Sequence, residues 1–554
     1  MARPAPRVTR RGGWPLALRL ALAALVLHLV LVQPNHPGAM TPQALLLFPL
    51  ELPVILLLLL ALPGSRRASR AVRLALVVFL TTGAAWKAAD LGMFVAFGRG
   101  FDPLVDGHLL AAGVNLGAGS LGLPQVVVAL LAMVASLAVV VAVAGLQWWA
   151  LAQWARVGLP RAVALGAGLA ACLAGGVAVA EAGQARRLWS LPVSPPGAAF
   201  TARLGWERVV ALRNSRATLL AFRAAALDDP FASGVGLLDR LGGRDVLVIF
   251  VESYGRSSFD TPFYAETHAP FLRAAEAKLA AAGLQARSAW LTSPITGGQS
   301  WLAHATLASG LMIGNQQRYR ALLASPRRSL WQIAGEAGYR TAAIMPAITM
   351  DWPEGERLGF GQILAAADMG YRGKPFNWVT MPDQFTLARG PGLLAPSDRP
   401  LMAQIVLISS HAPWVPVPRL LDWEALGDGR VFDAMATAGD APDVVWRDRD
   451  RVRAQYRLSL DYALETVMEF AARQGPDAPL MLVLGDHQAA GFVAQNASRD
   501  VPLHVIGPAQ ALAPMAEWGF APGLFPAAAP VWPMAAFRNR FLRSYSSAAP
   551  SGGT

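Results

Sequence analysis

The hydrophobic residues of this chain follow two different patterns. Up to about residue 183, long runs of Leu, Ala and Val are separated by short polar stretches, whereas the rest of the chain carries shorter apolar runs. Each long run approaches the ~20 apolar residues that an α-helix needs to cross a bilayer. We therefore predict five membrane-spanning helices, at roughly 15–33, 43–63, 72–97, 123–147 and 160–182.

The second part of the chain alternates between two kinds of segment. Short apolar runs typical of buried strands occur at 245–251, 285–291, 340–345, 404–409, 480–484 and 501–506. Amphipathic segments typical of helices occur at 270–282, 300–310, 328–337 and 451–473. This alternation predicts an α/β fold, with a mainly parallel sheet and helices on both of its faces.

These patterns divide the chain into four parts. We predict a helical membrane domain at 1–183, a connector at 184–243, an α/β domain at 244–545 and a disordered Ser/Ala/Gly-rich tail at 546–554. The connector contains a helical stretch from about 206 to 227, which we interpret as a stalk.

Basic residues predict the orientation of the membrane domain. Before the first span lie Arg3, Arg7, Arg10 and Arg11. Between the second and third spans lie Arg66, Arg67, Arg70 and Arg73, and between the fourth and fifth lie Arg156 and Arg161. The positive-inside rule then places the N-terminus in the cytoplasm. Five crossings of the cytoplasmic membrane would put the α/β domain on the periplasmic or extracellular side.

The net charge and the cysteine content narrow the class of protein further. Of the net charge of +12, the membrane part at 1–184 contributes +8, so we read it as a topology signal and expect no nucleic-acid partner. The single cysteine, Cys172, lies in the fifth predicted span, and the α/β domain is therefore predicted to contain no disulfide.

Two of the predicted strands end in side chains that bind metals. In Val246–Ser253 the apolar run ends where Glu252 begins the polar residues. In Leu480–His487 it ends before the pair Asp486 and His487. Ligands of open α/β sheets bind at the carboxyl ends of the strands, so we expect these three residues to meet at one edge of the sheet. A solvated strand end is the alternative for each of them.

A glycine turn between these two strands leads a serine into a helix. The segment Thr296–Leu307 places Ser300 after Gly297 and Gly298, at the start of a predicted helix. The free N–H groups and positive dipole end of that helix favour a phosphate and an alkoxide. Ser300 is therefore a candidate nucleophile; the alternative is a simple N-cap.

Histidine follows a further predicted strand, in the segment Ile408–Trp414. His411 could hold a substrate phosphate or protonate a leaving oxygen, or it could be a hydrogen-bonded loop histidine. We interpret His304 as a packing residue and His268 as structural.

Together these residues predict a centre for one divalent metal ion. Two carboxylates, one imidazole and one serine oxygen suit Mn²⁺, Mg²⁺ or Zn²⁺, and the number of oxygen ligands favours the harder ions. The predicted ligands are Glu252, Ser300, Asp486 and His487.

The order of these motifs resembles that of a known superfamily. Val251-Glu252-Ser253, Gly298-Gln299-Ser300, Ser409-Ser410-His411-Ala412-Pro413 and Gly485-Asp486-His487 resemble the alkaline phosphatase/sulfatase superfamily. Membrane spans followed by an outer domain resemble its lipoteichoic acid synthase and phosphoglycerol transferase branch. The resemblance implies one Mn²⁺ held by the four predicted ligands, Ser300 as the nucleophile and His411 as a substrate-facing catalytic residue.

One segment departs from that branch. Asp351-Trp352-Pro353-Glu354 falls where the synthases carry a Trp-Asn-Arg segment that grips glycerol phosphate. Trp352 fits this substrate-binding role, whereas Glu354 replaces or displaces the arginine. We therefore expect a single transfer or hydrolysis rather than polymer synthesis.

The resemblance implies a membrane-anchored phosphoryl transferase. We expect Ser300 to take a phospholipid headgroup phosphate, with phosphoglycerol preferred, and to pass it to a glycan or glycolipid acceptor or to water. The alternatives are a phosphoethanolamine transferase, a sulfatase-like phosphodiesterase or hydrolase, and a catalytically silent assembly factor of the cell envelope.

Overall fold

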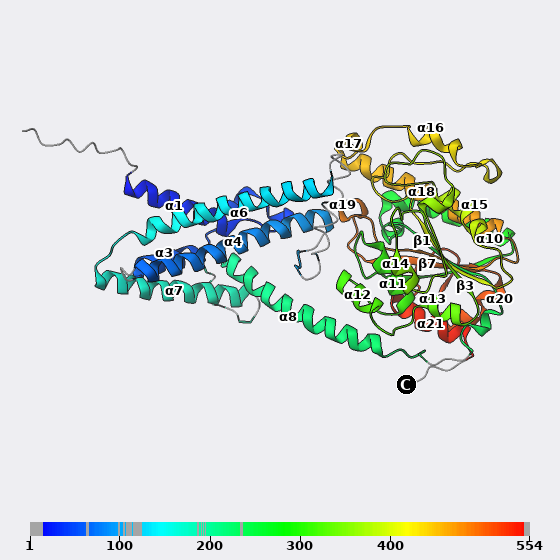
Figure 1. Cartoon of the computed structure of the whole chain (residues 1–554), viewed down its shortest axis with the longest axis horizontal. Coiled ribbons are helices and arrows are strands. Elements are labelled where there is room, and N and C mark those ends of the chain that lie inside the picture. Colours follow the sequence, from blue (N-terminus) through cyan, green and yellow to red (C-terminus); the bar gives the residue numbers. More distant parts are fainter. Residues whose placement is uncertain are drawn as a thin grey trace, which may run out of the picture. The chain divides into compact units, whose positions relative to one another are not determined.

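The computed structural model describes residues 15–547 except 63–65, 98–99, 104–105, 107–113, 115–123, 186–187, 190, 192, 194 and 233–235. The four arginines before residue 15 and residues 548–554 of the predicted tail therefore lie outside the described residues. The chain forms two compact units, Met1–Ala217 and Thr218–Thr554. Figure 1 colours the chain along its sequence and labels the elements of both units.

The first unit consists of apolar helices. Its main helices are α1 (Leu16–Val32), α3 (Glu51–Ala61), α4 (Arg66–Phe97), α6 (Gln125–Ala155), α7 (Arg161–Ala185) and the beginning of α8 (Phe200–Leu227). Of the described helices, three are long and apolar enough to cross a membrane, over Arg67–Val95, Val126–Ala155 and Arg161–Ala185. The apolar helices α1 and α3 have 17 and 11 residues. Because 11 helical residues rise only about 16 Å, α3 falls short of a ~30 Å hydrocarbon core, and the count of five spans stays a prediction.

Charged side chains buried in the first unit have partners. Lys87 of α4 is fully buried, and its Nζ donates hydrogen bonds to the Leu31 carbonyl and to Thr201 Oγ1, each at 2.8 Å. Asp90, one turn further along α4, pairs with Arg208 of α8. An unpaired charge in an apolar interior is costly, so these contacts fix the first turns of α8 against α4 within this unit.

The second unit contains one nine-stranded sheet. Its strands are β1 (Val246–Val251), β2 (Gln285–Thr292), β3 (Arg340–Met345), β4 (Gln362–Ala365), β5 (Leu401–Leu407), β6 (Leu480–Gly485), β7 (Asp500–Gly507), β8 (Ala521–Pro522) and β9 (Val531–Pro533). The order is β4-β3-β5-β1-β6-β7-β2-β8, with β9 paired to β2. Every residue of β1, β5 and β6 is buried, which explains their almost uninterrupted apolar sequences.

The sheet is mixed, whereas the alternation of strands and helices predicted a mainly parallel one. The strands from β4 to β6 are parallel, but β7 is antiparallel to both β6 and β2. Only one four-residue helix, α19 (Gly491–Ala494), lies between β6 and β7. A parallel return requires a crossover that is normally a full helix, and this connection contains none.

Helices cover both faces of the sheet, as predicted. Figure 1 shows α10 (Pro262–Ala281), α15 (Asp383–Leu393) and α18 (Arg449–Arg473) on one side, and α11 (Ser300–Ser309), α12 (Gln316–Leu323), α13 (Leu330–Glu336) and α21 (Ala536–Tyr545) on the other. Side-chain caps define two of the helix starts. Ser329 forms a capping box with Gln332 at α13, and Asp448 accepts from Asp450 N at α18.

Gly485, the last residue of β6, has no space for a side chain. A Cβ at this position would lie 1.8 Å from the Tyr254 carbonyl oxygen. We expect Gly485→Ala to force the ends of β1 and β6 apart and to destabilise the domain by about 1–3 kcal/mol, lowering its melting temperature. Gly491→Ala is the matched control, because nothing lies within 4 Å of its Cβ. Equal melting temperatures for the two variants would contradict this prediction.

Candidate metal and catalytic site

The two strand ends predicted to carry the site are neighbours in the sheet. Strands β1 and β6 are parallel, and Val251 lies opposite Gly485. The next residue of each strand, Glu252 or Asp486, therefore leaves the sheet at the same edge. Both side chains are buried, at 6% and 0% exposure.

The predicted ligand atoms converge at this edge. One ligand atom from each of Glu252, Asp486 and His487 lies within 4.8 Å of the other two. Ser300 Oγ donates a hydrogen bond to Glu252 Oε2 at 3.1 Å and lies 3.2 Å from His487 Nε2. His487 Nε2 is 3.4 Å from Glu252 Oε1. The structure thus brings together all four residues that the sequence pointed to.

The backbone beside these residues is held in unfavourable conformations. Ser253, which follows Glu252, has φ 58°, and Gln299, which precedes Ser300, has φ 60°. Trp414, three residues after His411, has φ 62°. Non-glycine residues rarely adopt left-handed conformations, and such strain tends to gather at functional sites. The strain here aims Glu252 and Ser300 at the same point.

The two carboxylates differ in how readily they hold a proton. Burial raises the pKa of Asp486 to about 6, and the nearby charge of Glu252 adds to the rise. Burial also acts to raise the pKa of Glu252, but the positive charges of His487 and His411 outweigh it and the pKa is lowered. Burial acts to lower the pKa of His487, and the two carboxylates reverse this effect and raise it. Two carboxylates held this close favour a cation between them.

The remaining hydrogen bonds leave free electron pairs that face the cluster. Asp486 Oδ1 accepts from Ser253 N at 2.9 Å and from His487 N at 2.7 Å, whereas the buried Oδ2 has no hydrogen-bond partner among the described residues. His487 Nδ1 lies 2.8 Å from the Gln488 carbonyl oxygen, which fixes the proton there and leaves Nε2 as a ligand. These donors fit a divalent cation.

His411 lies on the loop that follows β5, as its position after a predicted strand indicated. The ring is exposed, and Nδ1 lies 2.5 Å from the Ala412 carbonyl oxygen. The electrostatic effect of His411 acts to lower the pKa of Glu252. The neighbouring Ser410 Oγ donates to the Glu252 carbonyl oxygen at 2.6 Å, which joins this loop to the end of β1.

Trp352 and Glu354 lie at the start of α14 (Pro353–Arg357), beside α12. The ring of Trp352 packs 5.8 Å from that of Phe360. Burial raises the pKa of Tyr319 on α12, and the charge of Glu354 contributes to this rise. These contacts place both residues next to α12, and their predicted role in substrate binding stays a prediction.

Two of the other histidines are packing residues. The His304 ring lies 4.1 Å from the Phe250 ring, and burial lowers its pKa to about 4. His268 is fully buried and lies 3.3 Å from Asp461 Oδ1. Both observations agree with the structural interpretation of these residues from the sequence.

Asp383, the first residue of α15, is a site-supporting residue that the sequence reasoning missed. It is fully buried, and its Oδ1 accepts from Ile408 N at 2.7 Å and Ser409 N at 2.9 Å. Burial raises its pKa to about 6. Asp383 thereby holds the loop that carries His411. The sequence signal was a Pro-Asp pair at a helix start. Such a pair is also favoured at helix starts with no functional role, so it did not single out Asp383.

Comparison with known proteins agrees with this geometry. The sulfatase family model matches residues 244–506. No curated protein sequence matches the chain.

Solved structures with a similar fold include a synthase and two transferases. The lipoteichoic acid synthase LtaP from Listeria monocytogenes is 12% identical over 47% of this chain and 65% of its own, with a TM-score of 0.32. The Streptococcus pyogenes phosphoglycerol transferase GacH, in complex with sn-glycerol-1-phosphate, is 12% identical over 52% and 74%, with a TM-score of 0.34. The phosphoethanolamine transferase EptA from Neisseria meningitidis is 13% identical over 96% of both chains, with a TM-score of 0.45.

The chain spans 65% of the length of the LtaP structure. Residues 244–506 form a domain that matches the sulfatase family model, and Glu252, Ser300, Asp486 and His487, which converge at one edge of the sheet, all lie within it.

Proposed function

We propose that this protein is a membrane-anchored, metal-dependent phosphotransferase that uses Ser300 as its nucleophile. The observation that carries the proposal is the position of Ser300 Oγ. It lies 3.1 Å from Glu252 Oε2 and 3.2 Å from His487 Nε2, at the first residue of α11. Glu252, Ser300, Asp486 and His487 would hold one divalent cation, which we propose to be Mn²⁺.

A two-step transfer follows from this arrangement. A bound cation would lower the pKa of the serine hydroxyl and offset the charge of the substrate phosphate. Ser300 Oγ attacks the phosphorus of a phosphodiester, its proton passes to Glu252 Oε2, which already accepts a hydrogen bond from it, and a phosphoserine ester forms. The P–O bond to the leaving alcohol breaks, and His411 supplies the proton for that alcohol. An acceptor hydroxyl or water then passes its proton to His411, which the first step left deprotonated, and attacks the same phosphorus. The P–O bond to Ser300 breaks, and Ser300 Oγ takes its proton back from Glu252.

The N-terminus of α11 supports the charged phosphate during both steps. Ser300 is the first residue of this helix, so the positive end of the helix dipole lies at the group that Ser300 carries. The left-handed Gln299 directs the chain sharply into the helix. The strain placed there positions the nucleophile before substrate arrives.

We propose a phospholipid as the donor, with diacylglycerol as the leaving alcohol and phosphoglycerol as the group transferred. The apolar helices of the first unit support a lipid donor, because they would keep the enzyme at a bilayer. A glycan or glycolipid hydroxyl, or water, would be the acceptor. One observation favours phosphoethanolamine as a second candidate group: the Glu354 carboxylate would attract an ammonium group.

A donor assay tests both candidates. The purified full-length chain with Mn²⁺ is incubated with phosphatidylglycerol, phosphatidylethanolamine or phosphatidylcholine, and released diacylglycerol is measured. We expect release from phosphatidylglycerol, and loss of that release on chelation of the metal. Faster release from phosphatidylethanolamine would favour phosphoethanolamine as the group that the enzyme transfers. No release from any phospholipid would contradict a lipid donor.

We further propose that the protein crosses the cytoplasmic membrane five times, with its enzyme domain on the outer side. Three described helices are long enough to cross, and the predicted spans 15–33 and 43–63, which contain α1 and α3, would be the two others. A reporter active only outside the cytoplasm should work when fused after residue 183 and should fail near Arg67. The opposite pattern would overturn this topology.

A further inference from the structure

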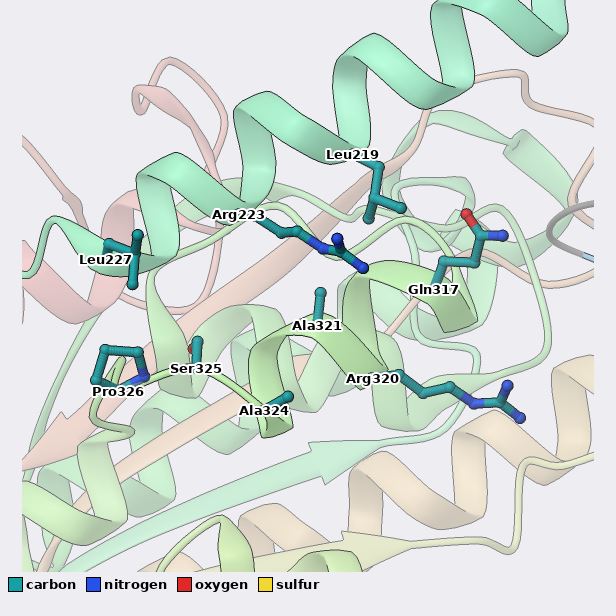
Figure 2. A pocket seen from close by; sticks show the side chains of 9 residues that line it. All are labelled: Leu219, Arg223, Leu227, Gln317, Arg320, Ala321, Ala324, Ser325 and Pro326. Atoms are coloured by element: carbon teal, nitrogen blue, oxygen red, sulfur yellow. The ribbon is translucent and has the colours of Figure 1, made fainter.

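A cavity of about 520 Å³ lies in the second unit, and no residue of the Ser300 cluster lines it. The last three turns of α8, the helix α12 and the turn that follows α12 form its walls. Figure 2 shows the nine lining side chains: Leu219, Arg223, Leu227, Gln317, Arg320, Ala321, Ala324, Ser325 and Pro326. None of these residues is used by the proposed transfer reaction.

The strip of α8 that lines the cavity lies beside the strip that packs in the domain core. On α8, Phe222 and Ala226 are buried in the domain core, at 7% and 1% exposure. The Arg318 guanidinium lies 5.6 Å from the centre of the Phe222 ring and helps to hold it. Leu219, Arg223 and Leu227 follow one another at intervals of about one turn and form the neighbouring strip, which lines the cavity (Figure 2).

The cavity combines positive charge with apolar walls. Two of its nine lining residues are arginines and none is acidic. Figure 2 shows the Arg223 guanidinium between the two helices, close to Ala321, while the Arg320 side chain leaves α12 in another direction. Leu219, Leu227 and Pro326 supply apolar surface, and Leu227 is 69% exposed.

The arginines of the cavity differ from the other arginines nearby. Arg327 and Arg538 both pair with Asp229, and Arg328 pairs with Glu336. Within the described part of the chain, neither the Arg223 nor the Arg320 side chain has an ion-pair or hydrogen-bond partner. Asp229 and Glu336 are paired with other arginines, so they do not offset the positive charge of the cavity.

We propose that this cavity binds an anionic phospholipid, with its phosphate at Arg223 and Arg320. Guanidinium groups bind phosphate oxygens through charge-assisted hydrogen bonds. The first carbons of the lipid chains would lie against Leu219, Leu227 and Pro326. The volume of the cavity is within the range of small-molecule sites, so it has room for a headgroup and these carbons. The site is separate from the centre at Ser300 and does not depend on the proposed reaction.

Photo-cross-linking in nanodiscs tests this proposal on the full-length chain. The Ser300→Ala variant is used so that no lipid is consumed. The nanodiscs contain phosphatidylcholine and a small fraction of phosphatidylglycerol that carries a diazirine next to its headgroup. After irradiation, mass spectrometry should find cross-links in the peptides that contain residues 219–227 and 317–326. Unlabelled phosphatidylglycerol should compete, and phosphatidylcholine should not.

The charge requirement is tested by paired variants. Arg223→Gln with Arg320→Gln should reduce cross-linking at these peptides by about tenfold or more, because two charge-assisted contacts are lost. Arg213→Gln with Arg216→Gln is the matched control, since it removes the same charge from α8 outside the cavity. It should leave cross-linking unchanged. All four arginines are exposed, so the variants should melt at the temperature of the parent protein.

Two results would overturn the proposal. Equal cross-linking by a diazirine phosphatidylcholine, with no effect of the paired arginine variants, would show a merely apolar surface. Displacement of the lipid by inorganic phosphate at low concentration would show a site for small anions rather than for a lipid. The readout is binding in a variant without the nucleophile. Failure of the donor assay would therefore leave this proposal standing, and its own failure would leave the Ser300 chemistry untouched.

Discussion

Replacement of Ser300 by alanine is expected to lower kcat by at least about a thousandfold, because it removes the only atom able to form the proposed phosphoserine. The loss should not come from unfolding. Among the described residues, Ser300 Oγ has polar contacts with Glu252 and His487, and the N-cap of α11 is Gln299. Alanine is also a good helix former. Turnover of phosphatidylglycerol and the melting temperature would be measured on the same preparation.

Ser300→Thr provides the matched control for this prediction. It retains a hydroxyl on the same carbon atom and should keep part of the activity. Trapping the reaction with acid should leave a phosphorylated residue 300 in the parent and threonine proteins and none in the alanine variant. An alanine variant with full activity would show that water attacks the donor directly and that Ser300 is only a helix-start residue.

Asp486→Asn is expected to abolish metal binding, with a loss of at least about a hundredfold in affinity. The asparagine oxygen can still accept from Ser253 N and His487 N, so the end of β6 should keep its conformation. Its NH₂ group would replace Oδ2, which has no hydrogen-bond partner among the described residues, and would point hydrogens at the cation. Metal content after dialysis, measured by elemental analysis, checks this result.

The same variant should change how the stability of the metal-free protein depends on pH. The pKa of Asp486 is raised to about 6 from an ordinary value of 3.8, so the folded state holds a proton that the unfolded state has released. Stability should therefore fall as pH rises from about 4 through about 6, as the folded carboxyl loses that proton. In the presence of a chelator, Asp486→Asn should show a weaker fall in melting temperature over this window.

Asp383→Asn is the matched control for the loss of metal. Asp383 is also fully buried, also accepts two backbone N–H groups and also has an oxygen without a hydrogen-bond partner among the described residues. It lies outside the group of potential ligands. This variant should keep its metal. Loss of metal from both variants would show that any change to a buried carboxylate disrupts the site.

The strand ends were the part of the site that the sequence could predict. Apolar runs that stop at Glu252 or at Asp486 follow from simple rules, because a fully buried strand has almost no polar residue until it leaves the sheet. The start of α11 at Ser300 was equally visible, since Gly297 and Gly298 mark a turn before an apolar helix. Parallel pairing of neighbouring strands then brings such ends to one edge.

Other features depend on contacts between distant segments and could not be read locally. The direction of β7 depends on the short connection after β6, and its apolar run fits either direction equally well. Asp383 supports the His411 loop through backbone groups that lie 25 and 26 residues away along the chain. Glu354 corresponds to the arginine of the Trp-Asn-Arg segment of the synthases by its sequence position alone. Its neighbour Tyr319 belongs to α12, a helix absent from the sequence prediction.

The pairing of β1 with β6 has a consequence for how the protein is made. Ser253 N and Asp486 Oδ1 form one hydrogen bond although the two residues are 233 positions apart. Strand β1 emerges early from the ribosome, fully apolar, and must wait for one of its central partners until most of the domain has been synthesised. Contacts of such long sequence separation form slowly and leave unpaired strands open to aggregation. A chain truncated before β6 lacks Asp486 and His487 and should therefore be inactive. Its unpaired strands should also make it a target for chaperones and proteases.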